Sequence, residues 1–503
     1  MTWDATYDVV VVGSGAGAMT GAYLAARAGL SVAVVEKTDK LGGTTAYSGA
    51  AAWLPGTQVQ ERAGLPDSTE SARTYLNALL DEPDQAKLEA FLAEAPRLVA
   101  QLEEDPLLSF EFQAFPDYFE RPGRVPGGRS FVPTPLPLEE IGERRDLVRP
   151  PVDRERVGKG HHLGQPLAAG RAYIGRFLMA LDATGNATVH TRTAVDELLT
   201  EDDRVVGVAG TDGNGNRVTY GARRGVLLAA GGFERNHDER ARHGVPGNAA
   251  WTMAPEESNT GEPIAAAVAL GAATDLMDQA WFTPGIAHPD GSAAFTLGFR
   301  GGLVVDQNGQ RYANESLPYD QMGRAMAADA ARIPSYVVFD STSMGHLPAI
   351  AIPEGNPEDH LAAGTWHRAD TLVDLAAAIG VPADALVATV ERFNGFAAAG
   401  DDEDFDRGKD EFASYFASPV LVTVAEGPFW AARLVLSDLG TKGGLVTDVD
   451  ARVLRGDGSP IEGLYAAGNT SASMTGKFYP GPGAPIGTAM AFASRAVRHL
   501  AAT

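Results

Sequence analysis

The feature that most constrains the fold lies at the start of the chain. A continuous β-branched run at Tyr7–Val12 ends in the glycine-rich turn Gly13–Ala18. An alanine-rich helical pattern follows at Met19–Ala28, and a second strand at Ser31–Val35 ends at Glu36. A run of this kind is typical of a parallel strand that is buried on both faces. Strand, glycine turn, helix, strand and acid together predict an α/β chain whose parallel sheet binds a dinucleotide.

Each position of the turn has a physical role in holding a nucleotide. Gly13 permits the tight turn, Gly15 lets the backbone approach a pyrophosphate, and Ala18 takes the third small position where helix and strand pack closely. The first N–H groups of the helix suit phosphates, and the carboxylate of Glu36 suits ribose hydroxyls. We therefore predict nucleotide contacts from Gly13, Ser14, Gly15, Ala16, Gly17, Ala18, Glu36 and Lys37.

A second loop, Lys40–Gly49, indicates which dinucleotide is bound. It is rich in glycine and hydroxyl groups; NAD enzymes have no need of it, whereas two-dinucleotide-binding flavoproteins wrap the FAD pyrophosphate with such a loop. Two short strands that end in small residues, Gly225–Gly232 and Gly463–Asn469, are placed where the chain would return to the nucleotide sheet. The four segments predict bound FAD, with further contacts from Gly42, Gly43, Thr44, Thr45, Ser48, Gly49, Ala230, Gly231, Gly468, Asn469, Pro485 and Ile486.

Because both ends of the chain contribute to the FAD site, the middle must be an insertion. The expected fold is a Rossmann-like two-dinucleotide-binding FAD domain with an inserted α+β catalytic domain. We predict the first part of the FAD domain at residues 1–279, with a proline- and arginine-rich, lid-like excursion at about 105–166. The catalytic or substrate domain is predicted at 280–442, and the FAD domain returns at 443–503. A final helix over Ile486–Ala502 would bring its positive N-terminal end to the flavin and favour the anionic reduced form.

Composition excludes several other classes of protein. The 503 residues carry a formal charge of −24 and no cysteine. So acidic a surface disfavours nucleic acid and anionic lipid headgroups, and the missing thiols exclude disulfides, iron–sulfur clusters and cysteine nucleophiles. No targeting or membrane-spanning stretch is visible, so we expect a cytoplasmic protein, with loose peripheral membrane association left open. His161-His162 are interpreted as solvated loop residues, and the acidic stretch Asp401–Glu411 is interpreted as a solvated loop or helix face. No metal site is predicted.

The segment Arg311–Asp320 carries an Asn-Glu pair at 314–315. It resembles the FAD-dependent fumarate reductase and succinate dehydrogenase superfamily, in which the residue five positions after that Asn is the proton-transfer arginine for dicarboxylates. Tyr319 takes this position here. The substrate-binding histidines of that superfamily find no clear match, and the loop Lys40–Gly49 lacks the histidine that carries covalent flavin. The resemblance therefore implies non-covalent FAD and a substrate other than a charged dicarboxylate.

A proline-rich loop, Gly476–Met490, is the second piece with chemical content. Its prolines fix their φ angles and contribute no N–H groups, so the few remaining N–H groups become aimed donors. The phenol of Tyr479 and the N–H of Gly483 can then grip an oxygen on which negative charge develops.

With this loop, Phe115–Tyr118 and Leu436–Gly444, the chain resembles the bacterial 3-ketosteroid Δ1-dehydrogenases over essentially its whole length. The resemblance implies 1,2-desaturation of 3-ketosteroids such as 4-androstene-3,17-dione, in which the C2 proton and the C1 hydride leave in trans and flavin N5 accepts the hydride. The electron acceptor that follows stays unidentified.

The same resemblance assigns the roles of individual residues. Tyr479 and Gly483 would stabilise the C3 enolate, and Tyr319 would take the C2 proton. Tyr118 would hydrogen-bond Tyr319 and pass the proton towards solvent. Phe115 and Phe295 are predicted to wall the apolar steroid site, at a gain of roughly 25 cal/mol per Å² buried.

Two alternatives stay open. Within enzymes, the rival is a Δ4(5α)-desaturase or another flavin dehydrogenase that acts on an apolar ketone. From another class, the rival is a flavin-binding electron carrier or sensor, although such a protein needs no catalytic base. The sequence does not name the preferred steroid, the electron acceptor or the oligomeric state.

Overall fold

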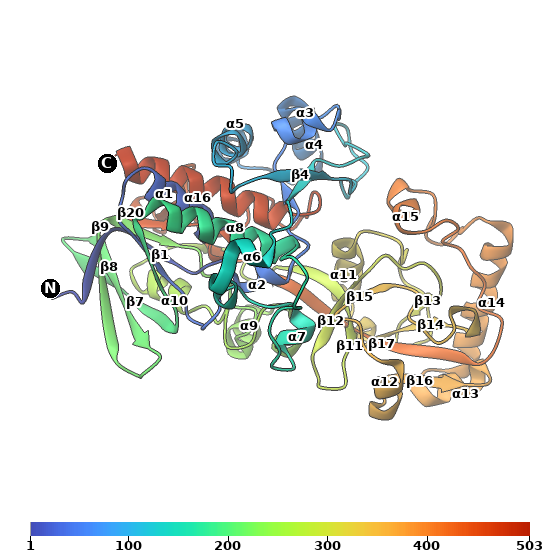
Figure 1. Cartoon of the computed structure of the whole chain (residues 1–503). Coiled ribbons are helices and arrows are strands. Elements are labelled where there is room, and N and C mark those ends of the chain that lie inside the picture. The colour runs from blue at the N-terminus through green and yellow to red at the C-terminus, as the bar shows by residue number, and fades with distance from the viewer. Residues whose placement is uncertain (1, 503) are drawn as a thin grey trace. The chain divides into compact units, whose positions relative to one another are not determined.

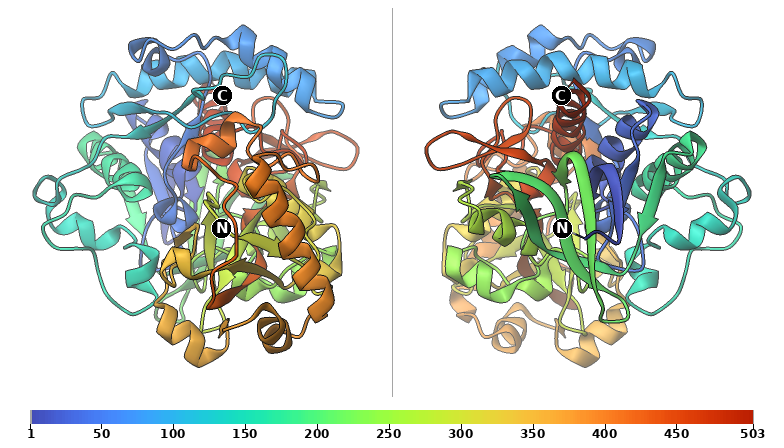
Figure 2. Two further views of the ribbon diagram at one scale, coloured as in Figure 1. Left: turned by 90° about the vertical axis from the view of Figure 1, so that its right-hand side faces the viewer. Right: turned by 90° about the vertical axis from the view of Figure 1, so that its left-hand side faces the viewer.

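The computed structural model describes residues 2–502 (Figures 1 and 2). They form two compact units. The first unit comprises the described residues up to His243, then Ala254–Ala280, and the residues from Gly440 on; the second comprises Gly244–Met253 and Trp281–Leu439. The predicted domain limits at 279/280 and 442/443 stay a prediction, because compactness does not test whether a part folds by itself.

A largely parallel sheet forms the centre of the first unit. Its strands follow the order β19-β20-β9-β1-β2-β6, and β1 pairs in parallel with both β2 and β9. Val9–Val12 are buried, as the β-branched run predicts for a strand covered on both faces. Figure 2 shows the long strands β7, β8 and β9 (green), which extend the sheet with antiparallel pairs. The strands are β1 (Ala5–Val12), β2 (Val32–Val35), β6 (Ala187–His190), β7 (Thr193–Glu201), β8 (Arg204–Asp212), β9 (Arg217–Leu228), β19 (Arg452–Leu454) and β20 (Pro460–Ala466).

Helices cover this sheet. In Figure 1, α1 and α16 run side by side, and α1 also packs against α8. The predicted final helix is confirmed, and it begins two residues earlier than expected, directly after Gly483. The helices of the first unit are α1 (Ala16–Arg27), α2 (Gly43–Tyr47), α3 (Gln58–Arg62), α4 (Thr69–Leu79), α5 (Gln85–Leu102), α6 (Leu138–Ile141), α7 (Val152–Glu155), α8 (Ala169–Thr184), α9 (His237–His243), α10 (Glu262–Ala269) and α16 (Ala484–Ala502), with short 3₁₀ turns at Gly142–Leu147 and Gly468–Thr470.

The proline-rich excursion of the first unit contains regular structure. A small antiparallel sheet in the order β3-β5-β4 joins β3 (Ala52–Trp53) to β4 (Phe110–Gln113) and β5 (Ser130–Pro133). A further pair, β10 (Thr274–Asp275) and β18 (Gly444–Leu445), links two chain segments that are far apart in sequence. Because β3 closely follows the loop Lys40–Gly49, its pairing with β5 ties the excursion to that loop.

His161 lies in the same excursion and differs from its predicted surroundings. Its side chain is half-buried, and Nε2 lies 2.9 Å from the carbonyl oxygen of Val148 and 3.1 Å from that of Arg145. Burial lowers the pKa of His161. His161 therefore lies in a loop, as predicted, but its side chain is only partly exposed to solvent, because its Nε2 is hydrogen-bonded to backbone carbonyl groups of the excursion.

The second unit is built on an antiparallel sheet with the order β13-β14-β17-β11-β12-β15, and β16 pairs with β17. Its strands are β11 (Ala280–Ala287), β12 (Ala293–Leu297), β13 (Leu303–Val305), β14 (Ser335–Phe339), β15 (Ile350–Ile352), β16 (Trp366–Ala369) and β17 (Phe429–Thr441). Its helices are α11 (Tyr319–Ala327), α12 (Pro357–Ala363), α13 (Leu372–Ile379), α14 (Ala383–Ala399) and α15 (Glu411–Phe416), with 3₁₀ turns at Ala249–Trp251, Ala330–Arg332 and Ser341–Ser343.

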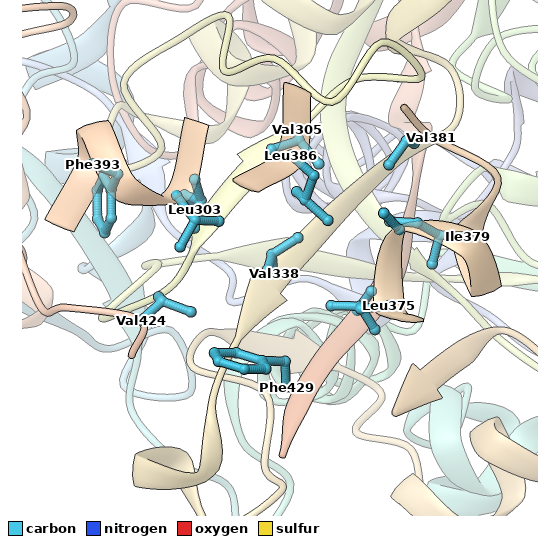
Figure 3. Close-up of a cluster of buried hydrophobic side chains, with 13 residues drawn as sticks. Leu303, Val305, Val338, Leu375, Ile379, Val381, Leu386, Phe393, Val424 and Phe429 are labelled. Carbon is cyan, nitrogen blue, oxygen red and sulfur yellow. The ribbon is translucent and has the colours of Figure 1, made fainter. Parts of the chain in front are cut away.

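The core of the second unit forms where α13 and α14 pack on this sheet (Figure 3). Leu386, Val390 and Phe393 recur at helical spacing along α14 and are fully buried. They meet Leu303 and Val338 from neighbouring strands. This apolar helix face holds one side of the sheet, from which the loop that leads to Tyr319 emerges.

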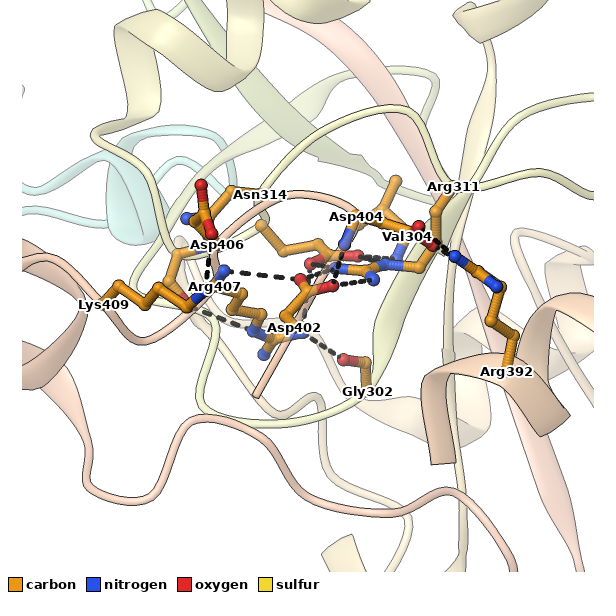
Figure 4. A network of polar contacts seen from close by, with 12 residues as sticks. Gly302, Val304, Arg311, Asn314, Arg392, Asp402, Asp404, Asp406, Arg407 and Lys409 are labelled. Carbon is orange, nitrogen blue, oxygen red and sulfur yellow. Dashed lines mark hydrogen bonds and ion pairs between the residues drawn. The ribbon is translucent and has the colours of Figure 1, made fainter. Parts of the chain in front are cut away.

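A buried ionic network lies beside that core (Figure 4). Arg311 Nη2 lies 2.9 Å from both Glu315 Oε2 and Asp402 Oδ2, and Arg407 Nη1 lies 3.2 Å from Glu315 Oε2. Arg407 and Asp402 are 1% and 0% exposed. The interpretation of Asp401–Glu411 as a solvated loop or helix face is therefore wrong for these two residues, because Arg311 is a charge partner for Asp402 in the interior and Glu315 is one for Arg407.

We expect Asp402→Asn to lower the free energy of unfolding by about 2 kcal/mol at pH 7, since it weakens charged hydrogen bonds to Arg311. Burial raises the pKa of Asp402, but the hydrogen bonds and charge of Arg311 outweigh it, and the net pKa is lowered. The ionised form therefore stabilises the fold above about pH 4. This stabilisation is lost as the pH falls through the folded-state pKa.

The measurement is chemical denaturation of both proteins at several pH values. The matched control is Asp401→Asn, whose carboxylate is exposed and pairs with the exposed Lys409. Exposed pairs contribute about 0–1 kcal/mol. Equal stability of the two variants at pH 7, or a difference that grows below pH 4, would contradict the network's role.

Candidate active site

The turn after β1 has the geometry that close approach of a ligand requires. Gly13 has φ +104°, and a Cβ there would lie 2.3 Å from the carbonyl oxygen of Ala229, so only glycine fits without a shift of the backbone. Its N–H donates to Val35 O at 2.8 Å, which ties the turn to the end of β2. The turn therefore delivers the start of α1 to the carboxyl edge of the sheet, as the sequence predicts.

Ser14 connects the turn to the acid and to the second loop. Its hydroxyl donates to Glu36 Oε2 at 2.5 Å, and it accepts from the N–H of Gly42 at 2.8 Å. The other carboxylate oxygen of Glu36 accepts from the N–H of Thr38 at 2.8 Å. Ala16 N donates to Thr45 Oγ1 at 3.1 Å. Three of the predicted nucleotide segments thus meet in one hydrogen-bonded cluster.

The segments Gly225–Gly232 and Gly463–Asn469 are joined by Thr470, a residue that was not predicted from the sequence. Thr470 Oγ1 accepts from the N–H of Ala230 and donates to the carbonyl of Gly231, each at 2.9 Å. It follows Gly468 and Asn469 in a short 3₁₀ turn. The one sequence signal that could have indicated Thr470 is its position directly after Gly468 and Asn469. Ala230, Gly231, Gly468 and Asn469 are therefore brought to one end of the sheet.

The remaining predicted cofactor residues have other contacts in the structure. Lys37 Nζ lies 2.8 Å from Glu262 Oε1 and 2.6 Å from Thr260 Oγ1. Ser48 Oγ donates to the carbonyl of Thr45 at 2.7 Å. Pro485 and Ile486 stand in the first turn of α16. Direct contact of these side chains with a cofactor stays a prediction.

The first turn of α1 and the neighbouring loop Lys40–Gly49 suit an anionic dinucleotide. The first N–H groups of a helix have no partner within it, and the first turn of α1 contains no acidic residue that would repel a phosphate. The Oγ1 atom of Thr44 is buried without a hydrogen-bond partner among residues 2–502. The residues present therefore fit FAD, whose pyrophosphate needs such donors.

The proline-rich loop forms a rigid turn in the first unit. Tyr479 is 3% exposed. Gly483 has φ +86°, and a Cβ at this position would lie 1.9 Å from the carbonyl oxygen of Ala51. The carbonyl of Gly483 accepts from the N–H of Trp53 at 3.1 Å. The loop is thus fixed against β3, and α16 starts directly after it.

Tyr118 and Phe115 lie beside this loop. The ring centroids of Tyr118 and Tyr479 are 5.2 Å apart with an interplanar angle of 62°, and those of Phe115 and Tyr118 are 6.0 Å apart at 74°. The N–H of Tyr118 donates to the carbonyl of Pro480 at 3.0 Å. The structure therefore brings together three of the predicted steroid-side residues of this unit.

The second unit contains Tyr319 and Phe295, the other two aromatic residues that were predicted for the steroid site. Tyr319 is the first residue of α11, after Pro318, and it is 6% exposed. Its ring meets that of Phe295 edge-on, with centroids 4.9 Å apart. Tyr319 therefore lies at the end of α11 where the unpaired N–H groups of a helix carry partial positive charge. The expected hydrogen bond between Tyr118 and Tyr319 stays a prediction.

The parallel sheet, the glycine turn, the acid and the second loop define a dinucleotide-binding flavoprotein. The sequence profile of the family described as "FAD binding domain" matches residues 8–486. A 3-oxosteroid 1-dehydrogenase of Rhodococcus opacus is 41% identical over 99% of this chain and 99% of its own. A 4-oxocyclohexanecarboxylate 2-dehydrogenase of Sinomonas cyclohexanicum is 34% identical over 99% of this chain and 93% of its own.

A solved structure is similar over the whole length. The 3-ketosteroid delta1-dehydrogenase from Sterolibacterium denitrificans, in complex with 1,4-androstadiene-3,17-dione, has a TM-score of 0.90 and 35% identity over 99% of each chain. This chain belongs to the FAD-binding flavoprotein family, in the branch that holds the 3-oxosteroid 1-dehydrogenases. The predicted fold class and the predicted cofactor, FAD, are confirmed. In the described part of the chain, no helix is long and apolar enough to span a membrane.

Proposed function

We propose that this chain catalyses the FAD-dependent 1,2-desaturation of 3-ketosteroids. The observation that carries the proposal is the rigid loop that holds a buried phenol, Tyr479, and the N–H of a left-handed glycine, Gly483, four residues apart. Its support is the full-length similarity to a 3-oxosteroid 1-dehydrogenase.

The chemistry explains why such a loop is needed. A C2–H bond next to a ketone becomes acidic only when the C3 oxygen can carry negative charge. The hydroxyl of Tyr479 and the N–H of Gly483 would donate to that oxygen, and each aimed donor contributes about 3 kcal/mol in sites of this kind. Because the loop is already rigid, the two donors need no rearrangement as the charge develops.

Tyr319 is the proposed base for the C2 proton. A free phenol has a pKa near 10 and is a poor base at neutral pH. Its place at the start of α11 favours the phenolate, and Tyr118 is proposed to hold the proton and pass it on. Bound FAD supplies the oxidant that accepts the C1 hydride. Proton and hydride together leave the double bond between C1 and C2, conjugated with the ketone.

Apolar side chains are proposed to give the substrate its affinity. A steroid offers little besides hydrocarbon area, so rings such as those of Phe115 and Phe295 would recognise it. The substrate class is that of 4-androstene-3,17-dione, and the similar solved structure holds the corresponding 1,4-diene.

Cytoplasmic location stays a prediction.

A second candidate substrate is a smaller ring ketone. The relative that acts on 4-oxocyclohexanecarboxylate is 34% identical over nearly the whole chain, and desaturation next to a ring ketone needs the same enolate grip and the same base. The difference would lie in the walls of the site rather than in the reacting groups.

The test is anaerobic. The purified yellow protein is mixed with 4-androstene-3,17-dione, the flavin absorbance is followed, and the steroid is identified. We expect bleaching and a 1,4-diene. A saturated steroid, 5α-androstane-3,17-dione, is tested in parallel, because 4-androstene-3,17-dione already has the double bond between C4 and C5. Loss of hydrogen from C4 and C5 of the saturated steroid would indicate Δ4(5α) chemistry instead. Bleaching by 4-oxocyclohexanecarboxylate alone would favour the smaller ketone, and no bleaching with any ketone in FAD-loaded protein would favour an electron carrier or sensor.

A further inference from the structure

Tyr75 joins the two loops that carry Tyr118 and Tyr479. It lies on α4 and is 0% exposed. Its hydroxyl donates to the carbonyl oxygen of Pro480 at 2.6 Å and accepts from the N–H of Phe119 at 3.1 Å. Phe119 directly follows Tyr118, and Pro480 directly follows Tyr479. One phenol therefore bridges the residues next to both aromatic groups.

The same carbonyl has a second donor. The N–H of Tyr118 donates to Pro480 O at 3.0 Å, so this oxygen accepts from Tyr75 and from Tyr118 at once. The ring centroids of Tyr118 and Tyr479 lie 5.2 Å apart. Three hydrogen bonds around one backbone carbonyl and one phenol thus set how far apart the two rings stand.

Tyr75 is itself held by a buried ion pair. The guanidinium of Arg129 lies 5.7 Å from the centre of the Tyr75 ring and 5.4 Å from that of Trp53. Arg129 pairs with Asp117 at 2.9 Å and with Asp67 at 2.7 Å, and all three side chains are 0% exposed. Asp117 directly precedes Tyr118. The support of Tyr75 therefore reaches the Tyr118 loop a second time.

Only a neutral phenol can make this bridge, because it must donate and accept together. Burial raises the pKa of Tyr75 far above its ordinary value, so the hydroxyl keeps its proton at any pH at which the enzyme would work. Tyr75 is thereby a poor acid or base. Its bonds go to backbone groups, and they suit it to positioning other residues rather than to proton transfer.

We propose that Tyr75 is a positioning residue for the desaturation, which sets the spacing between the Tyr118 hydroxyl and the oxygen-binding pair Tyr479 and Gly483. This inference rests on the proposed function, because it matters for catalysis only if both groups act on the same ketosteroid. Tyr75 does not touch the reacting atoms in this proposal.

The test compares Tyr75→Phe with Tyr23→Phe. Tyr23 is equally buried, at 1% exposed, and its hydroxyl donates to Asp105 Oδ2 at 2.8 Å, away from both loops. In Tyr75→Phe, we expect kcat for 4-androstene-3,17-dione, per bound FAD, to fall about 10- to 100-fold with KM changed less than about twofold. The isotope effect on flavin bleaching with 2-deuterated steroid should rise. A kcat within about twofold of that of Tyr23→Phe would overturn the proposal.

Amide hydrogen exchange provides a readout that needs no turnover. Loss of the bridge should speed exchange at Tyr118 and Phe119 in Tyr75→Phe but not in Tyr23→Phe. Unchanged exchange at both amides would overturn the bridge. If the unmodified chain does not desaturate the steroid while the exchange result holds, the proposed function fails and the bridge stands.

A second variant covers the case in which Tyr75→Phe does not fold. Ser130 Oγ donates to the carbonyl of Pro482 at 2.5 Å, within the same loop. Ser130→Ala should lower kcat in the same direction by about 3- to 10-fold with KM nearly constant. A kcat equal to that of the unmodified enzyme would then overturn the proposal that side chains from other segments, such as Tyr75 and Ser130, position the loop Gly476–Met490 through hydrogen bonds to its carbonyl groups.

Discussion

Replacement of Tyr319 by Phe is expected to lower kcat for 3-ketosteroid desaturation by about 10²- to 10⁴-fold, the range over which a general base contributes. The ring of Tyr319 packs edge-on against Phe295, and a phenylalanine keeps that contact. FAD content and the fold should therefore be unchanged. The rate to measure is anaerobic bleaching of the flavin by 4-androstene-3,17-dione.

The location of Tyr319 makes this expectation specific. The residue opens α11 after Pro318, at the end of a helix that favours negative charge. The resembled superfamily has an arginine at this position, which is already charged and suits dicarboxylates. A phenol instead suits an uncharged ketone, and its loss leaves no other proposed base.

The matched control is Tyr312→Phe. Tyr312 lies on the same segment, and its hydroxyl is 2.8 Å from Ser335 Oγ, so the variant removes a hydrogen-bonded phenol without touching the proposed base. We expect its bleaching rate to stay within about threefold of the unmodified rate. Full activity in Tyr319→Phe, or equal losses in both variants, would remove Tyr319 from the role of base.

The parallel sheet could be predicted because its signals are local. The β-branched run that becomes β1, the glycine turn and Glu36 all lie between residues 7 and 36, and hydrophobic pattern and turn chemistry suffice to place them. The final helix was predictable for the same reason. Its start was predicted two residues late, at Ile486, although Pro485 suits the first turn of a helix, where an N–H has no partner within the helix.

The buried side of the acidic stretch could not be predicted in this way. Asp402 and Arg407 are interior because Arg311 and Glu315 are folded against them from about 90 positions earlier in the chain. No periodicity of the stretch itself reports a partner at that distance. Composition alone favours solvent for such residues, and tertiary ion pairing overrides that preference.

In the candidate site, too, local motifs could be predicted from the sequence, whereas contacts between residues far apart in the chain could not. The tyrosines and Gly483 were predicted from their resemblance to a family motif, whereas Tyr75 was not predicted at all. Its hydroxyl reaches Pro480, 405 positions later, and α4 carries no motif that singles it out. Residues that perform chemistry recur as recognisable patterns, but the residues that position them are defined only by three-dimensional contact.

Replacement of Tyr479 by Phe is expected to lower kcat by about 10²- to 10³-fold, the cost of removing one aimed donor from an oxygen that becomes negatively charged. Tyr479 is buried and its ring packs against Tyr118, so phenylalanine preserves the packing. Binding of FAD should be unaffected. The KM should rise far less than kcat falls, because the lost interaction strengthens as the ketone becomes an enolate.

Two comparisons make this prediction decisive. The control is Tyr465→Phe, since Tyr465 is similarly buried and its hydroxyl lies 2.8 Å from His499 Nδ1; it should keep nearly full activity. The double variant of Tyr479 and Tyr319 should lose much less than the product of the two single losses, because both groups act in one enolisation step. Fully multiplicative losses would indicate that the two tyrosines stabilise the transition state independently of each other. An unchanged kcat in Tyr479→Phe would leave the Gly483 N–H as the sole donor to the ketone oxygen.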